Sequence, residues 1–128
     1  MEGREETRSI DHRPLALPNQ DGFLVVRREE ILFCSSHDNY SEVHFTQESR
    51  GRLVLSRTLK DVERFLAAHG FVRVHQGFLV NIVHVREYQR RSSGAELELS
   101  DGTRIPVSRR FRQQLMDRLD LLPPRSIR

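Results

Sequence analysis

Short apolar runs separated by turn signals dominate the chain from residue 22 onward. Residues 23–26 and 31–34 are two such runs, and residues 40–45 alternate so that Val43 and Phe45 share one face. Runs of this length, bounded by polar and charged residues, are typical of β-strands. The pattern therefore predicts a mainly β fold.

The second half of the chain adds further strand signals. Residues 71–85 hold six valines or isoleucines among 15 residues and are interrupted at Gly77, which predicts a pair of strands with a break at 75–77. Residues 95–99 alternate and continue through an Asp-Gly dipeptide into residues 104–107, the signature of a β-hairpin. Because Pro106 cannot donate a hydrogen bond to a neighbouring strand, we expect this last strand at a sheet edge.

Two helices are expected between these strands. The first covers residues 59–69, with Ser56 or Thr58 as its N-cap, and is ended by the glycine that follows it. The second begins after Ser108, has apolar residues four positions apart, and stops before the two prolines at 123–124. The chain thus alternates strands with two short helices.

The length of the chain leaves room for one domain. It has 128 residues and a mass of 15.0 kDa, which is a common size for a single globular unit. Residues 1–21 are polar, contain Pro14 and Pro18, and show no sustained period, so we expect a flexible or peripheral N-terminal arm. The expected division is arm 1–21, domain 22–122 and C-terminal tail 123–128.

Positive charge is concentrated near the C-terminus. The formal net charge is only +3, but residues 104–128 carry seven arginines against Asp117 and Asp120, whereas residues 1–30 are net negative. Lys60 is the one lysine among 21 basic residues. Arginine suits phosphate and guanine because its planar fork offers paired donors. The charge distribution therefore permits binding of an anionic partner, although the net charge of the whole chain does not identify that partner.

Several protein classes do not fit the sequence. The single cysteine, Cys34, cannot form an internal disulfide and lies in an apolar run, so we expect a buried, unreactive thiol. No apolar run approaches the roughly 20 residues that span a bilayer, and the N-terminus lacks the apolar region of a signal peptide. We therefore expect a cytoplasmic protein without membrane insertion.

Enzyme chemistry is also not indicated. The six histidines show no HExxH spacing, and the seven glycines are scattered, so neither a metal site nor a phosphate-binding loop is predicted. We expect no catalytic residues, no metal and no cofactor. A helix-turn-helix is likewise excluded, because residues 71–85 are rich in β-branched residues where the recognition helix would stand.

Polar side chains follow three of the predicted strands. Residues 35–40, 75–77 and 108–110 supply amides, imidazoles, a phenol and paired arginines. Each segment alone is typical of a turn, a β-break or a helix cap. Together they hold the side-chain types that contact phosphates and base edges.

The chain resembles the LytTR DNA-binding domain over roughly residues 22–120. The resemblance rests on four strings in the family's order and spacing: ILFCSS (31–36) with Asn39-Tyr40, LKDVE (59–63), FVRVHQGFLVN (71–81) and DGTRIPVSRR (101–110). It implies an elongated, mostly antiparallel β fold with two short helices. It also implies binding of double-stranded promoter DNA as repeated half-sites, through loops rather than a recognition helix.

The resemblance implies individual roles for residues of these strings. Tyr40, Gln76 and Arg110 occupy the positions that contact bases. Arg73 and His75 either support such contacts or hold the strand break in shape. The full set of expected phosphate or supporting residues is Asp38, Asn39, Arg57, Lys60, Arg73, His75, Ser108 and Arg109.

Family members commonly follow a receiver domain, and this chain has only about 22 residues before the matching region. A receiver needs on the order of 100 residues, so we expect either a stand-alone regulator or a fragment. A homodimer on DNA is expected from the repeated half-sites. The alternative is a protein-interaction module of the same fold, controlled by an inhibitory partner protein or acting on a partner, without specific DNA binding.

Overall fold

The computed structural model describes residues 12–46 and 50–125. In chain order its main elements are β1 (Leu15–Asn19), β2 (Gly22–Val26), β3 (Ile31–His37), β4 (Tyr40–Phe45), β5 (Arg52–Leu55), α1 (Leu59–Leu66), β6 (Phe71–His75), β7 (Phe78–Asn81), β8 (Val85–Arg91), β9 (Gly94–Leu99), β10 (Arg104–Val107) and α2 (Arg109–Asp117). Short 3-10 turns at Arg28–Glu30, Ala67–His69 and Ile82–His84 join some of them.

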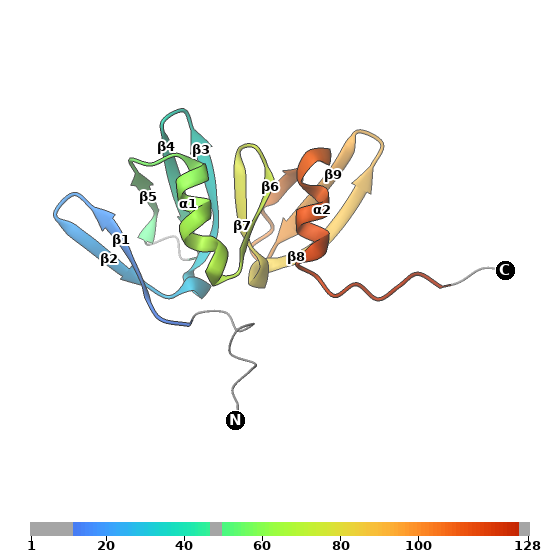
Figure 1. Cartoon of the computed structure of the whole chain (residues 1–128), viewed down its shortest axis with the longest axis horizontal. Coiled ribbons are helices and arrows are strands. Elements are labelled where there is room, and N and C mark those ends of the chain that lie inside the picture. The colour runs from blue at the N-terminus through green and yellow to red at the C-terminus, as the bar shows by residue number, and fades with distance from the viewer. Residues whose placement is uncertain (1–11, 47–49, 126–128) are drawn as a thin grey trace, which may run out of the picture.

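The strands form three antiparallel sheets that lie side by side along the long axis of the molecule (Figure 1). A β1–β2 hairpin stands at one end, a five-stranded sheet in the order β5-β4-β3-β7-β6 lies in the middle, and a sheet in the order β10-β9-β8 stands at the other end. The predicted mainly β, elongated antiparallel fold with two short helices is confirmed.

The five-stranded sheet has a hydrophobic core on each face. The first core lies under α1 and the β1–β2 hairpin, and the second core lies under α2 and the three-stranded sheet. Successive residues of β6 and β7 therefore point into different cores: Phe71 and Leu79 into the first, Val72 and Val80 into the second. Burial on both faces explains why these strands are apolar at consecutive positions.

Most of the local predictions are confirmed. The Thr58 side chain accepts a hydrogen bond from the Asp61 amide, so Thr58 is the N-cap of α1. The predicted helix over 59–69 is α-helical to Leu66 and ends in a 3-10 turn, after which Gly70 takes a left-handed conformation with φ +90°. Pro106 lies in the edge strand β10, as expected.

The N-terminal arm is a correction. Residues 15–19 were expected in a peripheral arm, but they form β1 and pair with β2, and Leu15 and Leu17 are each only 2% exposed. Their alternation with exposed Ala16 and Pro18 is a strand period that is too short to stand out in the sequence. Residues 1–11 of the expected arm lie outside the described residues.

Two further expectations are corrected at the C-terminal half. The second predicted strand of residues 71–85 ends at Asn81, and β8 follows as a polar strand that pairs with β9. Helix α2 ends at Asp117 rather than at the prolines, because Leu121 and Leu122 are 69% and 86% exposed and have no core to pack against. Within the described part of the chain, none of the helices has the length and apolar character needed to cross a membrane.

Two buried groups with polar atoms lie in the central sheet. Cys34 is fully buried in the first core, as expected, and this burial raises the pKa of its thiol to about 12. Asn81, also fully buried, donates from Nδ2 to the carbonyl oxygens of Arg28 and Ile31, each at 2.8 Å. The end of β7 is thereby tied to the entry of β3.

We predict that Asn81→Ala lowers the free energy of unfolding by about 2–3 kcal/mol, because two carbonyl oxygens lose their donor in a buried site. Urea denaturation monitored by circular dichroism measures the change. The control is Asn39→Ala at an exposed turn, which should shift stability by no more than about 0.5 kcal/mol. Equal effects of the two substitutions would show that the buried amide does not hold the sheet.

Candidate functional site

The polar loops that the sequence singled out lie along one edge of the molecule. The Ser36 amide donates to the Gly77 carbonyl at 3.0 Å, and the Ser108 amide donates to the Val74 carbonyl at 2.9 Å. These backbone bonds join the ends of β3, β6 and β10, and Figure 1 shows the β3–β4 and β6–β7 turns on the same side. We call this side the loop edge: residues 36–40, 56–58, 75–77, 92–93 and 108–110.

Tyr40 stands at the tip of the β3–β4 turn. It is 39% exposed, and its ring stacks on the His37 ring across the strand pair with centroids 5.4 Å apart. Asp38 adopts a left-handed conformation with φ +53°, which closes the turn and leaves Asp38 and Asn39 exposed. The tyrosine ring is therefore held at the loop edge by a second aromatic ring.

Gln76 occupies the β6–β7 turn and is exposed. The preceding His75 accepts a hydrogen bond at Nδ1 from the Gly77 amide at 3.0 Å and packs its ring against Phe78. His75 thus holds the strand break in place through its contacts with Gly77 and Phe78. The Gln76 side chain is the group of this turn that faces solvent.

Arg73 braces the same turn. Its Nε donates to the His75 carbonyl at 3.0 Å, and its two terminal nitrogens donate to the Gln76 carbonyl at 2.6 Å and to Glu63 of α1 at 2.8 Å. The guanidinium also lies over the Phe111 ring, 5.5 Å from its centroid, and the side chain is only 12% exposed. Of the two roles considered for Arg73 and His75, the contacts favour holding the strand break in shape.

The third loop leads into α2. Ser108 occupies the N-cap position but its side chain caps no amide, which corrects the expected cap; its Oγ is buried and has no hydrogen-bond partner among the described residues. Arg109 and Arg110 follow on the exposed first turn of the helix. The Arg110 guanidinium stacks on the Phe111 ring at 4.9 Å, which limits its freedom beside the loop edge.

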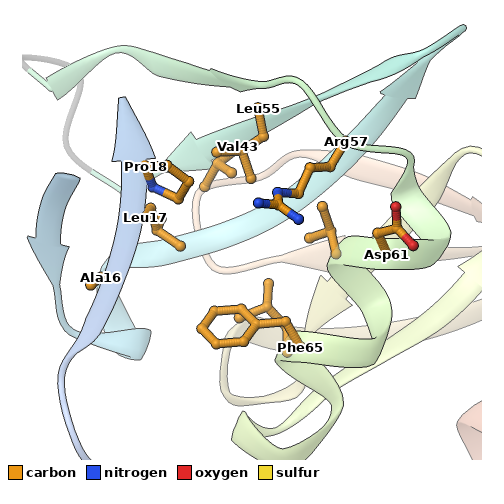
Figure 2. Close-up of a pocket in the computed structure, with 10 residues that line it drawn as sticks. Ala16, Leu17, Pro18, Val43, Leu55, Arg57, Asp61 and Phe65 are labelled. Carbon is orange, nitrogen blue, oxygen red and sulfur yellow. The ribbon is translucent and has the colours of Figure 1, made fainter. Parts of the chain in front are cut away.

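Arg57 and Lys60 reach the loop edge in different ways. The Ser41 hydroxyl donates to the Arg57 carbonyl at 2.8 Å, so the backbone of Arg57 stands beside the start of β4. Its side chain instead reaches over an apolar cleft of about 280 Å³ between β1 and α1, next to Asp61 (Figure 2). Lys60 is exposed on the first turn of α1.

The sequence did not reveal a polar cluster behind Tyr40. The Ser35 hydroxyl lies 3.1 Å from His37 Nε2 and 3.0 Å from His44 Nε2, and Glu42 lies 3.3 Å from His37 Nε2. Burial, with a further contribution from Arg52, lowers the pKa of His44 below its usual range. The alternation of β4 places Glu42 and His44 on the face of the strand that does not carry Val43. Ser35 and His37 join this cluster only through the pairing of β3 with β4.

No cluster of three or more histidine, cysteine or acidic side chains in the described ranges is arranged to hold a metal ion. The loop edge instead gathers a phenol, an amide and arginines from segments that are distant in the chain. Such a set of side chains can contact a polar, anionic partner. The fold and this edge together define the class: a β domain that presents polar and basic side chains on loops.

Comparison with known proteins identifies the family. A family model described as the LytTr DNA-binding domain matches residues 21–120. The chain belongs to this family. A solved LytTr DNA-binding domain of a Bacillus cereus protein has the same fold, with a TM-score of 0.69 at 22% identity over 84% of this chain and 97% of that one.

Several longer relatives match this chain over part of their own length. The sensory transduction protein LytT of Bacillus subtilis is 29% identical over 90% of this chain and 46% of its own length. The transcriptional regulatory protein BtsR of Salmonella typhi is 31% identical over 76% of this chain and 39% of its own length. The CO-responsive transcriptional regulator RcoM of Rhodospirillum rubrum is 27% identical over 81% and 49%. The chain thus spans about half the length of these relatives or less.

We predict that Arg73→Lys lowers the free energy of unfolding by about 1–2 kcal/mol, since a single ammonium cannot replace the three-way guanidinium brace. Thermal or urea unfolding measures the loss, and amide resonances of residues 75–77 should shift in the NMR spectrum of the folded variant. Arg64→Lys, at an exposed ion pair with Asp61, serves as the control with no measurable loss. If both variants behave alike, the brace is not structural.

Proposed function

We propose that this chain is a sequence-specific DNA-binding module of a transcriptional regulator. The observation that carries the proposal is the convergence of Tyr40, Gln76 and Arg110 on one edge, although they come from three separate parts of the chain. Loop side chains presented along an edge can reach base edges, as a recognition helix would, while the strands behind them hold their spacing.

Each of the three side chains suits a different contact. The Arg110 guanidinium offers paired donors for the O6 and N7 atoms of guanine, and the Gln76 amide offers a donor and an acceptor that match adenine. The Tyr40 phenol can both donate and accept, and its stack on His37 holds the ring in place. Arg73 and His75 act behind them as positioning residues, because Arg73 donates to two carbonyls of the β6–β7 turn and His75 Nδ1 accepts from the Gly77 amide.

Phosphate contacts supply the rest of the affinity. Lys60, Arg109 and the backbone amides at the start of α2 lie on or beside the loop edge, and Arg57 can join them by leaving its cleft. If about five phosphates are neutralised, the logarithm of the binding constant should fall with the logarithm of salt concentration with a slope of roughly −4 to −5. We further propose that two copies occupy adjacent repeats on one duplex.

We predict that Arg110→Ala weakens binding by ~1–3 kcal/mol and relaxes the preference at one base pair, whereas Lys60→Ala weakens all duplexes alike. The target is first recovered by selecting bound duplexes from a random pool. Competition binding then compares the selected and a scrambled duplex for each variant. Arg86→Ala, an exposed arginine away from the loop edge on β8, controls for loss of charge.

The wild-type protein decides whether the proposal stands. It should bind the selected duplex at least ~1,000-fold more tightly than the scrambled one at physiological salt. Equal affinity for both duplexes would show that the protein does not distinguish base sequences and binds DNA only through its charge. Failure to bind either duplex would instead favour a protein-interaction module of the same fold.

A further inference from the structure

A second basic feature lies on the loop edge beyond the base-reading residues. A cleft of about 290 Å³ opens between the β8–β9 turn and the first turns of α2. Its lining includes four arginines and two serines but no acidic side chain: Arg90, Arg91, Ser92, Ser93, Arg109 and Arg112. Of these residues, the family resemblance assigns only Arg109 to a DNA contact.

The strand register of β8 and the residue spacing of α2 place three of the arginines beside one another. Arg90 pairs with Ala95 two positions beyond the Tyr88–Leu97 pair, so Arg90 and Tyr88 point to the same face of the sheet, the one that packs on the second core beside α2. Arg109 and Arg112 are three residues apart on α2 and share a side of its first turns. The cleft is therefore walled by guanidinium groups from two elements.

Among the described residues, only one of these four arginines has an acidic partner. Arg91, on the opposite face of β8, hydrogen-bonds to Gln89 at 2.6 Å and lies 3.4 Å from Glu96. By contrast, the side chains of Arg90, Arg109 and Arg112 make no ion pair or hydrogen bond with any residue that the structure describes. Like charges gathered without a counter-charge repel one another. An anion bound between them would remove that repulsion.

We propose that this cleft binds the phosphate backbone of the DNA next to the bases read by Arg110, and so extends the DNA footprint past the three reading loops. The inference rests on the proposed function. Arg109 and Arg112 flank Arg110 on the same helix, so a strand whose base meets Arg110 passes its neighbouring phosphates close to the cleft. The hydroxyls of Ser92 and Ser93 add neutral donors at its rim.

The assignment separates two kinds of arginine on one helix. Arg110 contributes base preference. Arg90 and Arg112 contribute binding affinity that does not depend on the base sequence and that falls as the salt concentration rises. A phosphodiester strand suits this site because its phosphates continue along the same strand from the base that meets Arg110. A duplex must therefore extend far enough on the Arg110 side to fill the cleft.

The test uses the double variant Arg90→Gln/Arg112→Gln and a duplex with a single half-site of the selected sequence, in long and shortened forms. On the long duplex, the variant should bind about 10-fold to 100-fold more weakly at low salt, with a salt slope less negative by about 2 and the base preference intact. Both side chains are exposed and their substitution removes like-charge repulsion, so the thermal unfolding midpoint should not fall. Arg86→Gln, elsewhere on β8, is the matched control and should bind like the wild type.

Shortening the duplex from each end in turn locates the contact. For the wild type, removal of base pairs from one end should cost the same factor as the double substitution, and the variant should be insensitive to that removal. Equal affinities of variant and wild type on the long duplex, with wild-type specificity retained, would overturn the cleft assignment alone. A variant that loses affinity equally on both shortened duplexes would also overturn it. Absence of specific binding by the wild type would instead refute the proposed function.

Discussion

Burial of the central strands on both faces is the constraint on which the rest of the structure depends. Because β6 and β7 feed one core from Phe71 and Leu79 and another from Val72 and Val80, a shift of register by one residue would exchange the two sets of side chains between cores of different shape. The register is therefore strongly specified. The positions of the turns at the ends of these strands are fixed by the same register. These turns carry the candidate recognition residues.

A few hydrogen bonds fix the positions of the loops relative to these strands. The amides of Ser36 and Ser108 bond to the β6–β7 turn and to β6, and the Arg73 guanidinium bonds to two carbonyls of that turn and to Glu63 of α1. Loops fixed in this way lose little conformational freedom when a ligand binds. The domain thus presents side chains from strand ends with a rigidity that other DNA-binding domains obtain from a helix in the major groove.

The sequence predicted the elements whose patterns are local. Strands buried on both faces appeared as continuous apolar runs, and Thr58 marked the start of α1. It did not predict β1, whose alternation covers only a few residues, or β8, a mostly polar strand that depends on its partner β9. Site residues came from the family resemblance, which left open whether Arg73 supports DNA contacts or holds the strand break. The partners that favour the second role, and the cluster around Arg90, became visible only after distant elements were placed side by side.

The central claim is that one edge of the molecule meets the DNA, and mapping of backbone amide shifts during titration with the selected duplex tests it most directly. The account predicts the largest shifts at residues 38–40, 75–77, 90–93 and 108–112, with little change in the β1–β2 hairpin or at the β9–β10 turn on the opposite side (Figure 1). Shifts centred on the hairpin or on the β9–β10 turn, with the loop edge unchanged, would contradict it.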